Sequence, residues 1–243
     1  MSLVDITDVS KRFGGVVALD GLFMEINEGE ILGLVGPNGS GKSTLINVLS
    51  GFYPADGGTV MFSGENATGL AAHQLAGLGI ARTYQIPRPF DTMTPRENIA
   101  VSYMFGHSRH SLQGALDAAE KWLDFTDLAR VADVPISELT LHQLKFLELA
   151  RALATDPGLL LLDEVLAGLN PSEINQSVEM IRRIHDRGVT ILVVEHVVRA
   201  VMALSDRLVV IDQGRVISEG EPEAVMTDPA VVSAYLGEKR PGA

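Results

Sequence analysis

The sequence predicts an α/β fold with a mostly parallel sheet. In the first and last thirds of the chain, short apolar runs alternate with segments of helical spacing, and turn residues separate them. Between residue 86 and about residue 155, only helical patterns occur. Strands that alternate with helices form a parallel sheet, with its ligand at the carboxyl ends of the strands. Residues 86 to about 155 are therefore expected to form a helical lobe inserted into an α/β core.

The N-terminal part begins with strand patterns. Residues 3–9 predict an edge strand, residues 11–15 a turn, and residues 16–19 and 22–26 a second strand with a kink. The further elements expected here are a buried strand at 31–35, a helix after residue 44, a strand at 59–62, a short helix at 71–78 and a buried strand at 80–85.

From residue 86 to about residue 155, helical patterns occupy residues 95–105, 112–128 and 143–154. We expect residues 86–155 to form the helical subdomain and residues 1–85 and 156–237 the core, with a disordered tail at 238–243. The core elements expected after the lobe are strands at 159–162, 189–194 and 207–211, helices at 171–187 and 197–204, and a hairpin-like pair at Val216 and Ile217.

Composition narrows the class of protein. At 243 residues, with 46% apolar and 21% charged residues, the chain can bury a sizeable core. No apolar stretch reaches the roughly 18 residues needed to cross a bilayer, and residues 1–7 do not resemble a signal peptide, so a soluble or peripheral protein is expected. The absence of cysteine excludes disulfides and thiolate metal sites. A net charge of −12 argues against nonspecific nucleic-acid binding.

One stretch carries the strongest functional signal, because it matches Gly-x-x-x-x-Gly-Lys-Ser/Thr at every fixed position. An apolar run suited to a buried strand precedes it, and helical spacing follows it. The glycines let successive N–H groups turn toward phosphate oxygens at a helix N-terminus. Lys42 is expected to reach the β- and γ-phosphates of a nucleotide, and Ser43 to ligate Mg²⁺. The stretch reads Gly36-Pro37-Asn38-Gly39-Ser40-Gly41-Lys42-Ser43-Thr44.

Acids and a histidine follow two later strands. Asp163 and Glu164 come directly after the apolar run 159–162. Asp163 is predicted to hold Mg²⁺ directly or through water, and Glu164 to polarise an attacking water. The alternative is a core strand that ends in surface acids. His196 follows the strand at 189–194 and is expected at the same sheet edge, where it could contact the γ-phosphate; otherwise it is a turn residue.

The order and spacing of these motifs resemble the nucleotide-binding subunit of an ABC transporter over essentially the whole chain. Within that superfamily the chain looks most like the ATPases of branched-chain amino acid importers. The residues behind this finer resemblance are Lys11-Arg12-Phe13-Gly14-Gly15, Ala81-Arg82-Thr83-Tyr84-Gln85, Ala167-Gly168-Leu169-Asn170-Pro171, Val194-Glu195-His196 and Ala234-Tyr235-Leu236-Gly237-Glu238.

The resemblance implies a P-loop NTPase core with an N-terminal antiparallel β subdomain and the inserted helical subdomain. It implies that Phe13 stacks on adenine, although a core aromatic is the alternative. Gln85 would help to hold Mg²⁺ and the water, unless it is an ordinary polar residue at a strand end. The loop 85–90 would sense a membrane partner, and His196 would be the switch histidine.

The family's signature, Leu-Ser-Gly-Gly-Gln, is altered here to Leu139-Thr140-Leu141-His142-Gln143. The resemblance implies that Thr140 and Gln143 approach the nucleotide of a partner subunit, and that the side chain of His142 obstructs that approach. Thr140 and Gln143 also form a capping-box pattern, so the stretch can equally be a helix start. Two further departures are Asn170 for the usual Asp and Val165 for the usual Pro.

The resemblance implies an ATP-binding and ATP-hydrolysing subunit, with Mg²⁺, that drives an importer of branched-chain or related amino acids. Its implied partners are two transmembrane permeases, a second ATPase subunit in a homo- or heterodimer formed with ATP, and, indirectly, a solute-binding protein, at the cytoplasmic face of the cell membrane. The alternative is a regulatory subunit that binds ATP and hydrolyses little of it. A DNA-repair or translation ATPase is disfavoured by the missing basic face and heptad insertion, and a GTPase by the missing Asn-Lys-x-Asp motif.

Overall fold

The computed structural model describes residues 1–106 and 112–236. The chain divides into two compact units, which are described one at a time. The first contains residues 1–72 and the chain from residue 190 onward, and the second contains residues 73–189. The predicted helical subdomain, 86–155, falls within the second unit. The tail for which disorder is predicted, 238–243, lies outside the described residues.

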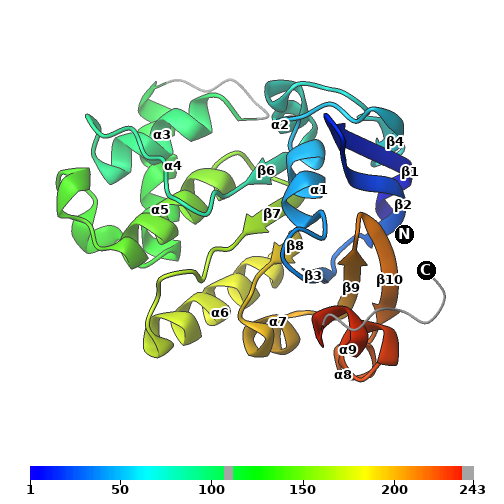
Figure 1. Ribbon diagram of the computed structural model, residues 1–243. Helices are drawn as coiled ribbons and strands as arrows, with labels where there is room; N and C mark the ends of the chain where they lie inside the picture. Colours follow the sequence, from blue (N-terminus) through cyan, green and yellow to red (C-terminus); the bar gives the residue numbers. More distant parts are fainter. Residues whose placement is uncertain (107–111, 237–243) are drawn as a thin grey trace. The chain divides into compact units, whose positions relative to one another are not determined.

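An antiparallel sheet opens the first unit (Figure 1). The N-terminal antiparallel prediction is thus confirmed, but the predicted turn at 11–15 is too long. Lys11 pairs with Leu19 and Phe13 with Val16, so only Gly14 and Gly15 remain in the turn. Lys11 is held in the strand by an ion pair with Asp56 at 2.7 Å. The strand order is β2 (Val16–Asn27), β1 (Ser2–Phe13), β4 (Gly57–Phe62) and β5 (Glu65–Asn66). The prediction of an edge strand at 3–9 is therefore wrong, because β1 pairs with β2 on one side and with β4 on the other.

The second sheet layer of this unit is built around a parallel strand that is buried along its whole length. β3 (Ile31–Val35) pairs in parallel with β8 (Thr190–Val194) on one side and with β9 (Arg207–Asp212) on the other. β10 (Arg215–Gly220) pairs antiparallel to β9. The apolar runs that predicted buried parallel strands therefore do form them, and β3 carries the chain directly into the glycine-rich loop.

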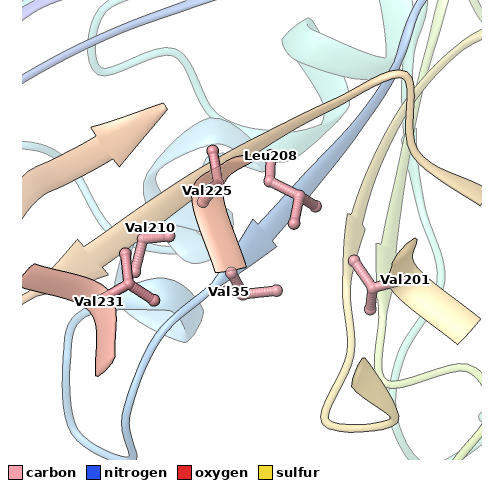
Figure 2. Close-up of a cluster of buried hydrophobic side chains, with 6 residues drawn as sticks. All are labelled: Val35, Val201, Leu208, Val210, Val225 and Val231. Atoms are coloured by element: carbon pink, nitrogen blue, oxygen red, sulfur yellow. The ribbon is translucent and has the colours of Figure 1, made fainter. Parts of the chain in front are cut away.

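Among the described residues of this unit, two of the four helices were not predicted. The predicted ones are α1 (Lys42–Leu49) and α7 (Val198–Leu204), and the others are α8 (Pro222–Met226) and α9 (Pro229–Leu236). The five residues of α8 are too few to show a helical period, and the residues of α9 are almost all apolar, so they show no distinct apolar face. Both short helices are stabilised by packing, because Val225 of α8 and Val231 of α9 belong to a buried apolar cluster. The other members of the cluster are Val35, Val201, Leu208 and Val210 (Figure 2).

The second unit contains one parallel strand pair and the predicted helices. β6 (Ile80–Arg82) pairs with β7 (Leu159–Asp163). The strand predicted at 80–85 ends at Arg82, because the backbone N–H of Tyr84 turns to the Glu148 carboxylate instead. The helices are α2 (Ala72–Leu78), which starts at the unit boundary, α3 (Pro95–Met104), α4 (Leu112–Phe125), α5 (Leu141–Leu153) and α6 (Pro171–His185), with short 3₁₀ turns at Ala129–Val131 and Ile136–Glu138.

Capping boxes fix the starts of three of these helices. Thr94, Thr140 and Asn170 are the N-cap residues of α3, α5 and α6, and each exchanges hydrogen bonds with the residue three positions later. Such reciprocal bonds satisfy backbone N–H groups that the first helical turn leaves open. Within the part of the chain that the structure describes, no helix has the length and apolar character needed to cross a membrane.

Candidate functional site

The loop between β3 and α1 has a backbone that only glycine allows at two of its corners. Gly36 and Gly41 have φ values of 150° and 114°. A Cβ atom at Gly36 would lie 2.0 Å from the carbonyl oxygen of Ile211, and one at Gly41 would lie 2.5 Å from that of Ala18. Both contacts are with backbone, which cannot give way. The glycines of the motif are therefore required by the shape of this loop.

Lys42 places a positive charge at the centre of the loop. Its side chain is buried, and Nζ donates hydrogen bonds to the carbonyl oxygens of Gly36 and Pro37, each at 2.8 Å. Ser43 is exposed and Thr44 half-buried in the first turn of α1. An ammonium group beside the N-terminus of a helix favours a bound anion, so the chemistry of the loop fits a phosphate chain.

A recess of about 250 Å³ lies beside the loop. His196, exposed after the end of β8, lines this recess, so the structure brings the predicted switch histidine and the phosphate loop together. The buried Glu195 lies next to it in the chain. Sequence reasoning did not include Tyr235 in the site, although it belongs to one of the stretches that carry the family resemblance. The lining residues are Gly36, Pro37, Asn38, Glu195, His196, Val198 and Tyr235.

Phe13 is a surface aromatic, which rules out the core alternative. The residue is 42% exposed at the end of β1. Its ring makes an edge contact with Tyr53 at 5.1 Å between centroids, and Lys11 Nζ lies 5.5 Å from its centroid. A half-covered ring of this kind has a face that a planar base can stack on. Adenine stacking by Phe13 remains a prediction.

In the second unit, Asp163 forms a buried ion pair that the sequence did not predict. Its Oδ2 accepts a hydrogen bond from an Arg82 guanidinium nitrogen at 2.7 Å, and the two side chains are only 11% and 9% exposed. Arg82 ends β6, the neighbouring strand in the parallel pair. This ion pair could have been predicted from the sequence, because two oppositely charged residues stand at the ends of adjacent strands.

Glu164 and Gln85 are brought together in the same unit. The Gln85 amide donates a hydrogen bond to the Glu164 carboxylate, and Lys145 Nζ lies 3.4 Å from the Glu164 carbonyl oxygen. Glu164 has φ 50°, a left-handed conformation that costs a non-glycine residue about 1–2 kcal/mol. The contact with Gln85 is the observation that supports the choice of Glu164 as a catalytic candidate.

The altered signature begins α5, and the capping alternative is confirmed. Thr140 Oγ1 accepts a hydrogen bond from the backbone N–H of Gln143 at 3.2 Å, and Gln143 Oε1 accepts one from the backbone N–H of Thr140 at 2.9 Å. His142 is half-buried, with its ring centroid 4.2 Å from that of Phe146 one turn later. Burial lowers the pKa of His142, and the charge of Glu173 opposes that shift.

The backbone of the signature contains no positive φ, so the missing glycines leave no strain there. Thr140 is exposed and Gln143 half-buried at the helix N-terminus. Their predicted contact with a partner's nucleotide remains a prediction. The His142 ring lies between them in the sequence and packs against Phe146 of the same helix.

The loop 85–90 is attached to α5 by two residues that sequence reasoning missed. The buried Glu148 carboxylate accepts backbone N–H groups from Tyr84 at 3.2 Å and Arg88 at 3.0 Å. Arg151 donates to the Arg88 carbonyl oxygen at 2.7 Å. Burial raises the pKa of Glu148, and the two backbone hydrogen bonds oppose that shift. The same helix therefore carries the signature at its start and holds this loop further along.

The candidate residues thus form two groups. The phosphate loop, Phe13 and His196 belong to the first unit, and Gln85, Asp163, Glu164 and the signature belong to the second. Each group is ordered within its own unit. That Lys42 and the two acids act on one nucleotide remains a prediction.

A glycine-lined loop around a buried lysine, set between a parallel strand and a helix, defines a P-loop protein of the nucleotide-binding class. A family model described as ABC transporter matches residues 19–167, and one described as branched-chain amino acid ATP-binding cassette transporter matches residues 215–240. The chain therefore belongs to the ABC transporter family.

Relatives match over nearly the full length. The chain is 36% identical to the high-affinity branched-chain amino acid transport ATP-binding protein BraF of Pseudomonas aeruginosa, over 97% of this chain and 98% of the relative. It is 37% identical to the protein LivG of Escherichia coli, which has the same description, over the same shares. A crystal structure of the ADP conformation of MJ1267, an ATP-binding cassette of an ABC transporter, superposes with a TM-score of 0.87 at 34% identity, covering 98% of this chain and all of that one.

Proposed function

We propose that this chain is the ATP-hydrolysing motor subunit of an ABC importer for branched-chain or related amino acids. The observation that carries the proposal is the phosphate loop, in which Lys42 is buried and hydrogen-bonded at the start of α1. Membership of the ABC transporter family makes ATP the expected nucleotide. The names of the full-length relatives, and the match at residues 215–240, support the cargo class.

Each part of the site has a proposed role. Lys42 and the loop amides hold the phosphates, and Phe13 stacks on the base. Glu164 accepts a proton from the attacking water, with Gln85 as the neighbour that orients its carboxylate. His196 contacts the terminal phosphate from its position in the recess beside the loop. These assignments place the positive groups on phosphate and the carboxylate on water, as a hydrolysis in which charge develops on the phosphoryl oxygens requires.

Mg²⁺ is the proposed metal, with Ser43, Asp163 and Gln85 as its protein neighbours. Among the described residues no group of three metal-binding His, Asp or Glu side chains occurs. That arrangement fits Mg²⁺ bound mainly through nucleotide phosphates and water, with one or two protein oxygens. Asp163 offers an oxygen of this kind, although one of its two oxygens is engaged by Arg82.

The proposed partners are two permeases that span the membrane and a second ATPase subunit that closes on this one with ATP. This subunit is proposed to lie at the cytoplasmic face of that membrane. A solute-binding protein is an indirect partner. Nucleic acid is not a partner on this proposal, since the net charge of −12 repels phosphate backbones. ATP that contacts both ATPase chains only in the closed form would shift the dimer equilibrium toward closure.

The signature favours a second candidate function, a regulatory subunit that binds ATP with little hydrolysis. His142 places an imidazole where the family has glycine, and its ring packs on Phe146.

Because the signature acts on the partner's nucleotide, we expect the defect to fall on the partner's site. This chain's own loop, Asp163, Glu164 and His196 would retain hydrolysis against a partner with an intact signature.

The test is steady-state ATPase activity of the transporter reconstituted with its permeases and both ATPase subunits. Glu164→Gln in this chain should abolish most turnover, whereas the corresponding substitution in the partner should matter less. Glu179→Gln, at an exposed position on α6, is the matched charge control and should leave activity unchanged. Equal losses from the two catalytic substitutions would refute the expectation that this chain's own site retains hydrolysis while the partner's site is impaired. Undiminished turnover with Glu164→Gln would refute the motor assignment and favour the regulatory one.

A further inference from the structure

Helix α5 buries two charged side chains on one of its faces. Lys145 and Glu148 are only 2% and 7% exposed. Their spacing of three residues places them next to each other on the helix surface. Lysine and glutamate are almost never buried to this degree unless they are paired or hydrogen-bonded. The groups that this buried pair contacts therefore indicate its role.

Lys145 contacts the peptide group of Glu164, the proposed general base. Its Nζ donates a hydrogen bond to the Glu164 carbonyl oxygen at 3.4 Å, and the backbone N–H of Ala167 donates to the same oxygen at 3.2 Å. The φ of 50° at Glu164 is left-handed, and a residue other than glycine keeps such a conformation only where the surrounding structure fixes it. Lys145 is thus one of the contacts that fix the backbone from which the Glu164 carboxylate projects.

Glu148 holds the segment that carries the neighbour of this base. Its carboxylate accepts hydrogen bonds from the backbone N–H groups of Tyr84 at 3.2 Å and Arg88 at 3.0 Å, which lie on either side of Gln85 in the chain. The Gln85 side-chain amide donates in turn to the Glu164 carboxylate. Helix α5 therefore holds both partners of the contact between Gln85 and Glu164, one through each member of the buried pair.

We propose that Lys145 and Glu148 are positioning residues, which together hold the Glu164 carboxylate against Gln85 for the activation of water. The inference rests on the proposed function, because it assumes that Glu164 is the base of an ATP hydrolysis. A base must lie within hydrogen-bond reach of the water from which it takes a proton, so a small displacement of its carboxylate lowers the rate. Loss of the Lys145 ammonium group would release the Glu164 carbonyl oxygen and let the backbone turn the carboxylate away from Gln85.

The test combines substitutions in the buried pair with the loss of the base itself. Lys145→Met removes the ammonium group and keeps a long apolar side chain, and Glu148→Gln leaves one acceptor oxygen in place of two. Lys121→Met, at an exposed position on α4, is the matched control for the loss of a lysine charge. Each substitution is made alone, and Lys145→Met is also made together with Glu164→Gln.

Three measurements are needed. Single-turnover and steady-state hydrolysis by the reconstituted transporter give kcat and KM for ATP. The affinity of the purified chain for a fluorescent ATP analogue reports on binding, and thermal unfolding without nucleotide shows that each variant folds. If Lys145→Met does not fold, Glu148→Gln carries the same test, because it leaves Lys145 and its contact unchanged.

We expect Lys145→Met to lower kcat about 10- to 100-fold, the range for the loss of a hydrogen bond from a charged group. KM and the affinity for the ATP analogue should stay close to the wild type, because the buried pair holds the base and not the phosphate loop. Glu148→Gln should lower kcat by a smaller factor, and Lys121→Met should leave it unchanged. With Glu164→Gln already present, Lys145→Met should have little further effect, because it acts through the side chain that has been replaced.

An unchanged kcat in a folded Lys145→Met or Glu148→Gln variant would overturn the inference and leave the proposed function intact. So would a loss from Lys145→Met that is as large with Glu164→Gln as without it, which indicates a general structural role. Undiminished turnover with Glu164→Gln alone would instead overturn the proposed function.

Discussion

Removal of Arg82 should destabilise the protein strongly, because it would leave the Asp163 carboxylate buried without its guanidinium partner. The two side chains are 9% and 11% exposed and 2.7 Å apart, so water screens their interaction very little. Removal of one partner from a buried ion pair typically costs about 3–5 kcal/mol. The Arg82 guanidinium also lies 4.9 Å from the Tyr84 ring centroid, and its loss adds about 0.5–1 kcal/mol.

The assay is a double-mutant cycle with Arg82→Ala, Asp163→Ala and the double variant, measured by urea unfolding. We expect Arg82→Ala alone to lower the free energy of unfolding by about 3–5 kcal/mol. The double variant should lose less than the sum of the single variants, with a coupling of about 2–3 kcal/mol. An additive cycle, within about 0.5 kcal/mol, would refute the reasoning.

A second ion pair in the same unit provides the matched control. Arg183 and Asp127 are 3.1 Å apart, but their side chains are 39% and 66% exposed. Exposed pairs contribute about 0–1 kcal/mol, so the same cycle on this pair should give a coupling at or below that range. Both pairs lie within hydrogen-bonding distance, so the difference between the two couplings is expected to reflect mainly the difference in burial.

Three further outcomes are expected. Glu148→Gln leaves one acceptor oxygen in place of two, so the backbone N–H of either Arg88 or Tyr84 loses its hydrogen bond. The free energy that protects this N–H from hydrogen exchange should fall by about 1–3 kcal/mol, and exchange in that loop should be faster. Unchanged exchange would contradict the role of Glu148. Burial lowers the pKa of His142, so its stabilising contribution is present above the unfolded pKa of about 6.5 and is lost as pH falls through the folded pKa. The variant His142→Gln should therefore lose less unfolding free energy than the wild type between about pH 7 and about pH 5. Equal losses in the two proteins would argue against the lowered pKa. Gly33→Ala puts a Cβ 2.4 Å from a Leu208 methyl carbon and should cost about 1–3 kcal/mol in thermal unfolding, whereas an unchanged melting temperature would mean that the neighbours give way.

Features set by local sequence could be predicted. The phosphate loop was found because its glycines and Lys42 stand at fixed spacings, and the backbone conformations at Gly36 and Gly41 explain those requirements. The capping box predicted at Thr140 and Gln143 is present and starts α5 at Leu141, two residues before the predicted start, and the same four-residue pattern begins at Thr94 and Asn170. In each case the residues that decide the structure are close neighbours in the chain.

Features set by distant partners were missed. Arg82 meets Asp163, and Glu148 meets the loop at Arg88, across separations of 81 and 60 residues. Helix α9 is stabilised by Val231, which is buried in a cluster from several elements, whereas its own residues are almost all apolar and show no one-sided pattern that would predict a helix. Local pattern therefore gave the candidate residues, whereas the contacts that hold them depend on long-range packing.

The position of Lys42 has a thermodynamic consequence for its ligand. Its ammonium group already donates to two loop carbonyls at 2.8 Å, so a phosphate that recruits it competes with those carbonyls. Binding at this position is then an exchange of one acceptor for another, and its measured heat is the difference between the two sets of bonds. Selectivity among nucleotides should accordingly depend on whether the outermost phosphate can outcompete the main chain for this cation, more than on how much surface the nucleotide covers.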